Sequence, residues 1–452
     1  MAAAVGVALL AASVVTVYRV LAPAEVVSAT GAAYPAPPRA TPRVIGSLAA
    51  APLIVDNRVR VYANTRQVRA DGPVNAHTQR SPNWSYRRWP QQLVGVVAAG
   101  ATVVSRWSDG HLIAIDAQTG RVAWRAIGPA PEINRYAGRR TGAEVVYAPR
   151  GLFTASGGAG RTAVLASGAG ELYGFDAATG RELWRTALGG HPDCRDGGFT
   201  TTGGRFVTLD ACGAEPALEF YDAATGRREA RWRPAGAGAS LGTLPVSCAV
   251  GRSECAAMRV QGASAVQAGQ AGQGARAWQG ARAAQGWLFD GSRPVRAPAL
   301  DSPTAWLADG IVVDCRAAEG PRGPHRAAAT LAGYPARGGA PLWRRPPGAG
   351  AGASAGAGAT GGRAEIVAVQ PGAVHLLTEH RWLITVDPAS GAELSRFDLR
   401  YRREPAELEW RPGHVYARNR FVLIERVSPD APPEADDDEY YPIDQAVLLV
   451  GS

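Results

Sequence analysis

Short apolar runs alternate with clusters of turn-forming residues along most of this chain. The run Leu112–Ile115, for example, is followed directly by the sequence Asp-Ala-Gln-Thr-Gly at residues 116–120. Apolar runs of about four to eight residues that are bounded by Gly, Pro, Asn or Asp are typical of β-strands. The pattern therefore predicts an all-β fold whose strands are joined by tight turns.

A strand, a turn and a Trp that follows the turn recur as one unit. In the first clear copy the turn runs from Asp116 to Gly120 and is followed by Trp124. The other copies are a full one at Asp176, Gly180 and Trp184, a partial one at Asp222 and Gly226 with Trp232 displaced by two residues, an eroded one at Gly339 and Trp343 with Pro335 in place of Asp, a fragment at Leu288–Gly291, and one at Asp387 and Gly391 with Phe397 in place of Trp.

Each position of the unit has a physical role. The Asp side chain caps the turn by accepting hydrogen bonds from the backbone that follows it. The Gly adopts a left-handed conformation that would cost another residue about 1–2 kcal/mol. An indole at one fixed place per unit can fill the space between two adjacent sheets. We therefore predict structural roles for all of these residues: Asp116, Gly120, Trp124, Asp176, Gly180, Trp184, Asp222, Gly226, Gly339, Trp343, Asp387 and Gly391.

The spacing of the units predicts the architecture. The positions equivalent to Asp are 116, 176, 222, 290, 335 and 387, so one unit spans 45 to 68 residues, enough for four strands. One period upstream lies Arg58–Tyr62, which alternates like a strand. A lone hairpin cannot bury its own faces, and radial closure of four-stranded sheets solves this. We predict a β-propeller with seven blades, with eight as the alternative, and expect the strand at 445–450 to complete the first blade.

The N-terminal segment differs from the repeat region. Residues Ala2–Val17 are apolar and uncharged, a run shorter than the about 20 residues of a membrane-spanning helix. Ala22-Pro23-Ala24 has the small-x-small form of a signal-peptide cleavage site. We predict a signal peptide or membrane anchor at 1–24, a Pro/Ala-rich linker at 25–42 and the propeller at 43–452. The protein is then exported, and is either anchored in the cell membrane facing outward or secreted.

Five cysteines are present, and none forms a CxxC metal pair. Their grouping predicts two disulfides, Cys194 with Cys212 and Cys248 with Cys255, and leaves Cys315 free. Closing a loop of about 18 residues would contribute about 3 kcal/mol. The alternative is that these are unpaired, buried thiols. An exported protein favours the disulfides.

Charge and motifs restrict the chemistry. The net charge is +9 and every basic residue is Arg, so no Walker A loop is present. The chain lacks an Arg-rich helix or a base-stacking motif, and we expect no nucleic-acid binding. The GxSxG match at 352–356 lies in a Gly/Ala tract and is attributed to chance. The aromatic stretch Trp84–Trp89 is interpreted as a blade edge, with a polysaccharide or peptide contact as the alternative. We expect no catalytic residue, no cofactor and no metal.

The pattern Ala114-x-Asp116-x-x-Thr119-Gly120-x-x-x-Trp124 resembles the tryptophan-docking motif of the pyrroloquinoline-quinone (PQQ)-like propeller family. The resemblance covers about residues 43–452 and is clearest at 104–232. That family includes quinoprotein dehydrogenases and BamB-like scaffold lipoproteins. A dehydrogenase of the family implies an axial pocket with a stacking Trp, acidic Ca²⁺ ligands, a catalytic Asp and usually two adjacent cysteines. No adjacent cysteines occur here.

The resemblance and the sequence together favour a monomeric, non-enzymatic, extracytoplasmic scaffold. Its partner would be a protein or an envelope polymer, and the N-terminal segment could add a membrane contact. The alternatives are a PQQ-dependent dehydrogenase and a sensor domain for a separate signalling partner.

Overall fold

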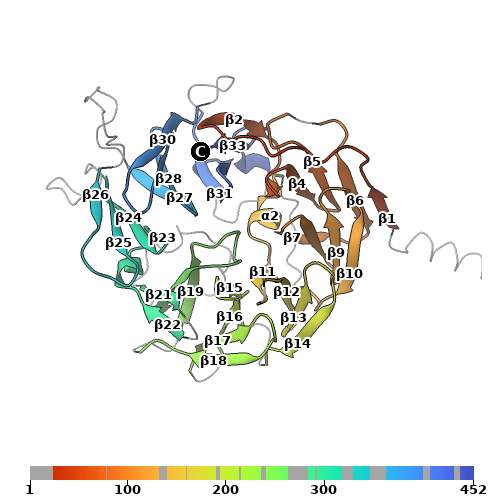
Figure 1. Cartoon of the computed structure of the whole chain (residues 1–452), viewed down its shortest axis with the longest axis horizontal. Helices are drawn as coiled ribbons and strands as arrows, with labels where there is room; N and C mark the ends of the chain where they lie inside the picture. Colours follow the sequence, from red (N-terminus) through yellow and green to blue (C-terminus); the bar gives the residue numbers. More distant parts are fainter. Residues whose placement is uncertain are drawn as a thin grey trace, which may run out of the picture.

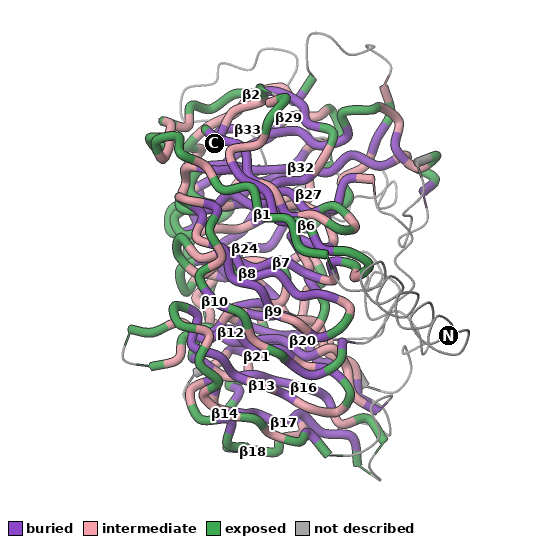
Figure 2. The backbone as a smooth tube through the Cα atoms, turned by 90° about the vertical axis from the view of Figure 1, so that its right-hand side faces the viewer, coloured by how far each residue is buried: buried purple, intermediate pink, exposed green. Residues whose placement is uncertain are grey.

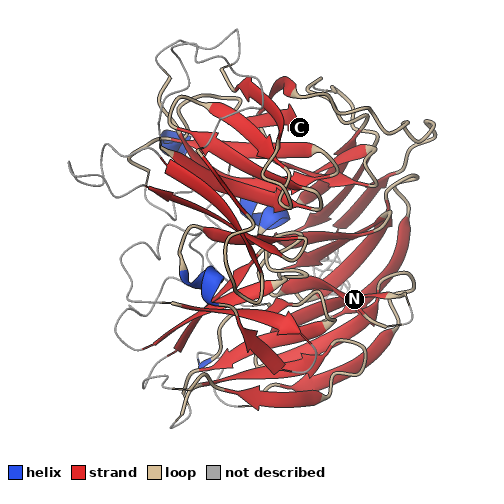
Figure 3. Ribbon diagram, turned by 60° about the vertical axis from the view of Figure 1, so that its left-hand side comes forward, coloured by secondary structure: helices blue, strands red, loops and turns tan. Residues whose placement is uncertain are grey.

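Eight antiparallel sheets stand around a central axis in the computed structural model (Figure 1). The structure describes residues 24–452 except 78, 132–139, 159, 190–193, 213–214, 236–240, 263–283, 291–292, 318–328, 347–362, 401–407 and 432–437. Almost all of the regular structure is strand, and the helices are short (Figure 3): α2 (Ala143–Tyr147), η3 (Pro298–Asp301) and η4 (Asp438–Tyr440). The protein is therefore an all-β propeller with eight four-stranded blades, and the predicted count of seven is wrong.

Blades 1 to 7 each take four consecutive strands, from the axis outward. Blades 1 to 4 contain, in order, β3 (Pro52–Val55), β4 (Val59–Asn64), β5 (Gln67–Asp71) and β6 (Trp84–Trp89); β7 (Leu93–Ala99), β8 (Thr102–Trp107), β9 (His111–Asp116) and β10 (Val122–Ile127); β11 (Leu152–Ser156), β12 (Thr162–Gly168), β13 (Glu171–Asp176) and β14 (Glu182–Ala187); and β15 (Phe199–Thr200), β16 (Arg205–Asp210), β17 (Ala217–Asp222) and β18 (Arg228–Trp232). Blades 5 to 7 contain β19 (Leu241–Val246), β20 (Ala257–Gly262), β21 (Gln285–Asp290) and β22 (Arg293–Arg296); β23 (Ala305–Ala308), β24 (Ile311–Ala317), β25 (Ala329–Pro335) and β26 (Trp343–Arg345); and β27 (Ala364–Gln370), β28 (Ala373–Thr378), β29 (Trp382–Val386) and β30 (Glu393–Asp398).

Blade 8 combines strands from both ends of the chain. Its strands are β31 (Arg411–Arg418), β32 (Phe421–Val427), β33 (Val447–Gly451) and β2 (Arg43–Leu48). The last strand, β33, pairs with β32 on one side and with β2 on the other, with Val450 opposite Val44. The prediction that this strand completes the first blade is therefore wrong, because β33 belongs to blade 8. Because no hairpin joins β33 to β2, this blade carries no Asp-x-x-Thr-Gly turn, and the repeat could not reveal it.

Blade 1 carries a fifth strand on its outer edge. Strand β1 (Ala24–Ser28) pairs antiparallel with β6, with Ala24 opposite Trp89. The Glu25 carboxylate lies 3.5 Å from Arg88 Nε and 3.0 Å from Arg125 Nη2, which ties β1 to blades 1 and 2. This strand lies at the surface (Figure 2). The predicted linker at 25–42 is thus partly a strand, and the predicted first unit near 61–62 lies in β4, the second strand of its blade.

The predicted signal peptide or anchor falls almost wholly outside the described residues, which begin at Ala24. Within the described part of the chain, no helix is both long and apolar enough to cross a membrane.

The hydrophobic core is divided into layers between neighbouring blades. Between blades 2 and 3, for example, Val104 and Leu112 pack with Leu152, Val164 and Phe175. The same arrangement recurs around the ring, and Figure 2 shows the buried strands running through the molecule. Burying apolar surface contributes about 25 cal/mol per Å², so the stability of each blade depends on its neighbours.

Four indoles are wedged between one blade and the turn of the next. The Nε1–H of Trp124 donates to the carbonyl of Ala177 at 3.0 Å. The equivalent bonds run from Trp84 to Ala117, from Trp184 to Ala223 and from Trp343 to Pro388, at 2.9, 3.0 and 3.0 Å. The Trp of one unit therefore docks on the Asp-x-x-Thr/Ser-Gly turn of the following unit.

Glycine makes room for each docked ring. A Cβ added at Gly180 would lie 2.4 Å from Trp124 Cδ2, and one at Gly226 would lie 2.3 Å from Trp184 Cε3. Gly120, Gly180, Gly226 and Gly391 all have φ between 67° and 70°. Gly339 differs, because the nearest atom to its added Cβ is Pro335 Cγ at 3.8 Å and no indole docks there.

The Asp of each turn organises the backbone around it. In blade 3, Asp176 Oδ1 accepts hydrogen bonds from the backbone N–H and the hydroxyl of Thr179, both at 2.9 Å. Asp116, Asp222 and Asp387 make the same pair of bonds in their turns. These bonds hold the pKa of Asp176 and of Asp387 below the usual value, because they stabilise the charged form.

Two aromatic residues that the sequence grouped with the docking motif have a different position. The strand register places Ala230 and Ser395 where Trp184 stands in blade 3. Trp232 packs instead edge-on against Trp287 with ring centroids 4.7 Å apart. Phe397 lies opposite Leu383, so it does not replace the Trp as expected.

Buried arginines join blades where they also satisfy backbone carbonyls. Arg106, on β8, is fully buried. It donates to Ser167 O, in β12 of blade 3, at 2.8 Å and to Pro129 O, in the connection that leads to blade 3, at 2.9 Å. Arg259, on β20, donates to Leu300 O at 2.9 Å and also to Ala305 O, which belongs to blade 6. Each guanidinium therefore connects a blade to the start of the next.

We expect Trp124→Ala to lower the free energy of unfolding by about 3–5 kcal/mol, because it would leave a cavity and remove apolar contacts between blades 2 and 3. Trp89→Ala is the control, since Trp89 is 49% exposed and stacks with Arg66 at the surface. Its effect should stay below about 1 kcal/mol. Urea denaturation followed by circular dichroism measures both, and equal shifts for the two variants would contradict the wedge role.

We expect the buried His375 to make the protein less stable in mild acid. Its Nδ1 lies 3.1 Å from Thr385 Oγ1, and burial lowers its pKa to about 4. Between this value and the usual pKa of about 6.5, the unfolded chain binds a proton that the folded protein does not. The contribution of the neutral His375 to the free energy of unfolding is therefore fully present above pH 6.5. It falls by about 2–3 kcal/mol as the pH decreases to 4.5. In urea titrations at pH 7 and pH 4.5, His375→Asn should remove this part of the loss, whereas His380→Asn, at an exposed position, should not.

Candidate functional site

The central axis is the natural place for a ligand in a ring of blades, and here parts of the chain itself enter it. The helix α2 lies inside the ring (Figure 1) and packs on the inner strands β3, β7 and β31. Its residues Ala143, Val145, Val146 and Tyr147 are buried. The helix belongs to the long connection between β10 and β11, so a segment between two blades fills one side of the axis.

Polar contacts fix α2 to blades 1 and 8. The Tyr147 hydroxyl donates to Pro52 O at 2.9 Å, and its ring stacks on Tyr416 with centroids 5.0 Å apart. The Thr141 hydroxyl, just before the helix, donates to the buried Glu425 carboxylate, which also accepts the Tyr441 hydroxyl at 3.0 Å. The buried carboxylate thus has hydrogen-bond partners from two separate connections.

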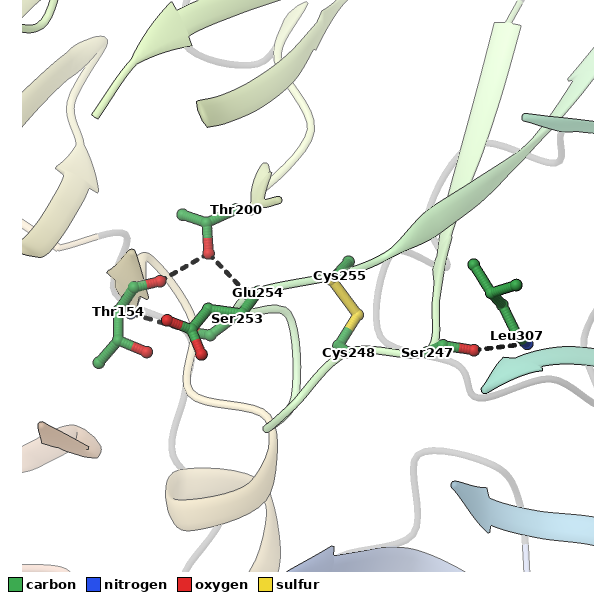
Figure 4. The surroundings of a disulfide bond; sticks show 8 residues. All are labelled: Thr154, Thr200, Ser247, Cys248, Ser253, Glu254, Cys255 and Leu307. Atoms are coloured by element: carbon green, nitrogen blue, oxygen red, sulfur yellow. Dashed lines mark hydrogen bonds between the residues drawn. A yellow bond between two sulfur atoms is a disulfide. The ribbon is translucent and has the colours of Figure 1, made fainter. Parts of the chain in front are cut away.

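A disulfide-closed loop enters the axis from the other side. This axial loop, residues 247–256, joins β19 to β20 in blade 5, and the Cys248–Cys255 disulfide closes it (Figure 4). Ser247 Oγ accepts a hydrogen bond from Leu307 N in blade 6 at 2.8 Å. Ser253 Oγ accepts one from Thr154 N in blade 3 at 3.1 Å. One loop therefore contacts blades on both sides of its own.

Backbone bonds dock the same loop on blade 4. Thr200 N donates to Arg252 O at 2.9 Å, and Cys255 N donates to Thr200 O at 2.8 Å. The Thr200 hydroxyl donates to Thr154 O at 2.6 Å and accepts from Glu254 N at 2.9 Å (Figure 4). Backbone hydrogen bonds to Thr200, as well as side-chain contacts, therefore hold the loop against blade 4.

The axial loop and α2 meet at Gly251. A Cβ added there would lie 2.3 Å from Tyr147 O, and its φ is 57°, so only glycine permits this approach. The adjacent Val250 packs on the core layer shared by blades 8, 1 and 2. Contacts thus run from blade 5 across the axis to the opposite side of the ring.

Two charged residues accompany the axial loop. Burial lowers the pKa of Arg252, and the nearby Asp196 partly offsets this effect. Asp196 accepts hydrogen bonds from Leu209 N at 2.8 Å in blade 4 and from the Thr243 hydroxyl at 2.9 Å in blade 5. Asp196 therefore joins two blades beside the loop.

The remaining cysteines have structural surroundings. The structure contains the other disulfide, between Cys194 and Cys212, which links the segment before β15 to the end of β16. Cys315 is free and buried, and its thiol donates to Ala364 O at 3.3 Å. Burial raises its pKa to about 12, so it stays protonated and unreactive near neutral pH.

The sequence pattern does not identify the residues that occupy the axis. The pairing of Cys248 with Cys255 was predicted, but these two residues give no signal of where the loop lies. The repeat residues, by contrast, lie between blades and away from the axis. Among the described residues, no three His, Cys, Asp or Glu side chains gather as a metal site. The GxSxG match at 352–356 lies outside the described residues.

Comparison with known proteins gives a family and a fold. The family model described as outer membrane protein assembly factor BamB matches residues 29–126 and 139–322, more than half of the chain. No curated protein is significantly similar in sequence.

Two solved structures illustrate the similarity. BamB from Moraxella catarrhalis is 14% identical, with 89% of this chain and 95% of that chain covered and a TM-score of 0.41. The C-terminal WD40 domain of Sif2 is 9% identical, with coverages of 91% and 99% and a TM-score of 0.45. At these values the two structures add no argument about function. The family match is sufficient by itself: the chain belongs to the BamB family of PQQ-like β-propellers.

Proposed function

We propose that this protein is a non-enzymatic scaffold outside the cytoplasm, which presents its rigid ring to a partner protein. The observation that carries the proposal is that α2 and the axial loop enter the axis and meet there at Gly251. A quinone cofactor on the axis would have to displace α2 or the axial loop, which is hydrogen-bonded to blade 4 through its backbone and to blades 3 and 6 through the hydroxyls of Ser253 and Ser247. Displacing either segment would leave buried polar groups without partners, at a cost of about 1–3 kcal/mol each.

The family supports a protein partner. The matching family is described as an assembly factor for outer membrane proteins, and assembly factors act on other proteins. The surface of this chain is basic, with a net charge of +9, so an acidic partner would be attracted and an equally basic one repelled. An eight-bladed ring with two disulfides offers a preformed surface that loses little entropy on binding.

The location outside the cytoplasm has two supports. The apolar run at Ala2–Val17 is typical of the central region of a signal peptide. The two disulfides form and persist in oxidising compartments and are rare in the cytosol.

Thiol titration tests the disulfides. Protein from the native host, unfolded without reductant, should show one thiol per chain, that of Cys315, and five after reduction. Five thiols before reduction would contradict both the disulfides and the proposed compartment.

The scaffold role is tested by binding and by activity together. Crosslinking in intact cells followed by mass spectrometry should recover a protein joined to the propeller in defined stoichiometry. The purified full chain, titrated with pyrroloquinoline quinone and Ca²⁺, should show neither stoichiometric quinone binding nor dye-linked alcohol oxidation. Quinone binding with turnover would overturn the proposal in favour of a dehydrogenase.

A further inference from the structure

A basic pocket lies at one end of blade 7, away from the axis. It is lined by His380, Arg381, Trp382 and Arg400 and has a volume of about 470 Å³. The turn between β28 and β29 supplies His380 and Arg381, Trp382 is the first residue of β29, and Arg400 follows β30. Leu399 N donates to Arg381 O at 2.8 Å, so the two walls of the pocket are fixed by the backbone.

Arg381 is the centre of this blade 7 pocket. Its guanidinium carbon lies 4.1 Å from the centroid of the Trp410 ring, which is itself buried. Its backbone has a φ of 67°, a conformation that is rare for a non-glycine residue, and Arg381 N donates to Thr378 O at 3.0 Å. The stacked indole and the tight turn hold the cation in one place before any ligand arrives.

Arg381 has no carboxylate within ion-pair distance among the described residues, although Glu409 acts on it from further away. Partial burial lowers the pKa of Arg381, because desolvation disfavours its charged form. Other arginines of the outer strands are paired, for example Arg185 with Glu182 and Arg396 with Glu393. An anion in the pocket would supply the charge that Arg381 lacks.

The other lining residues define the kind of anion. Arg400 is paired with Asp398, and His380 Nε2 lies 3.5 Å from Glu379 Oε1. Their side chains are 69% and 68% exposed, so both can still add donors at the rim. The planar guanidinium of Arg381 suits a carboxylate, which it can bind with two parallel hydrogen bonds. Trp382 adds partly exposed apolar surface for the methylene groups beside that carboxylate. The lining therefore fits Glu or Asp side chains better than a neutral ligand.

We propose that the blade 7 pocket binds a carboxylate side chain from an acidic peptide segment of the partner protein. This inference rests on the proposed scaffold function and names the chemistry of the partner. The principal contact is Arg381, and Arg400 and His380 extend it.

The test uses the full chain and a fluorescein-labelled oligo-glutamate peptide, followed by fluorescence anisotropy, with an oligo-glutamine peptide as the neutral comparison. Wild-type protein should bind the glutamate peptide and not the glutamine peptide. Arg381→Met, which keeps the contact with Trp410, should weaken binding about tenfold or more, and Arg400→Gln should weaken it by a smaller factor. The matched control is Arg185→Gln, an exposed arginine on β14, which should bind as wild type.

The outcomes separate this inference from the scaffold function. Equal binding by wild type, Arg381→Met and Arg185→Gln would overturn the pocket, as would binding of polyphosphate without binding of the peptide. If Arg381→Met fails to fold, the exposed Arg400→Gln decides by the same comparison. Cellular crosslinking that recovers a partner equally well with both pocket variants would reject the pocket and keep the scaffold function. Loss of the partner only in the pocket variants supports both.

Discussion

The docking of an indole on the turn of the next blade is the interaction on which the rest of this structure depends. It combines three requirements in one contact: apolar burial of the ring, a hydrogen bond from Nε1 to a backbone carbonyl, and a glycine against the ring face. A blade that satisfies only the first would be free to slide against its neighbour. The hydrogen bond fixes the height of one sheet relative to the next, and the ring can then close with every core layer aligned.

Where this contact is missing, the molecule uses other means. Blades 4 and 5 share the Trp232–Trp287 pair and Asp196, and blades 5 and 6 share the buried Arg259. The axial loop adds bonds from blade 5 to blades 3, 4 and 6 in the same part of the ring. The blades with the weakest repeat signal are thus joined by contacts that do not belong to the repeat. The axial loop therefore both occupies the axis and connects these blades.

Local chemistry determined what could be predicted from the sequence. The Asp-x-x-Thr/Ser-Gly turn is specified by adjacent residues, so the hairpins of blades 2, 3, 4 and 7 were visible, and remnants of the unit marked blades 5 and 6. Trp84 was not assigned as a docking residue, because the connection from β5 to β6 is longer and the usual spacing is lost. Blade 8 has no such hairpin, which explains the count of seven. The place of the axial loop depends on contacts with distant residues such as Thr154 and Tyr147, and no local pattern encodes these.

The origin of blade 8 has a consequence for how the molecule reaches its native state. Strand β2 is among the first segments of the chain, and β33 is the last, yet each needs the other as a hydrogen-bonding neighbour. Until they meet, β32 and β2 present open backbone edges, which can pair with another molecule. Joining segments so far apart in sequence is slow compared with forming a hairpin. We therefore expect the pairing of β2 with β33 to form late in assembly, and loss of either strand would leave its neighbour with an unpaired backbone edge.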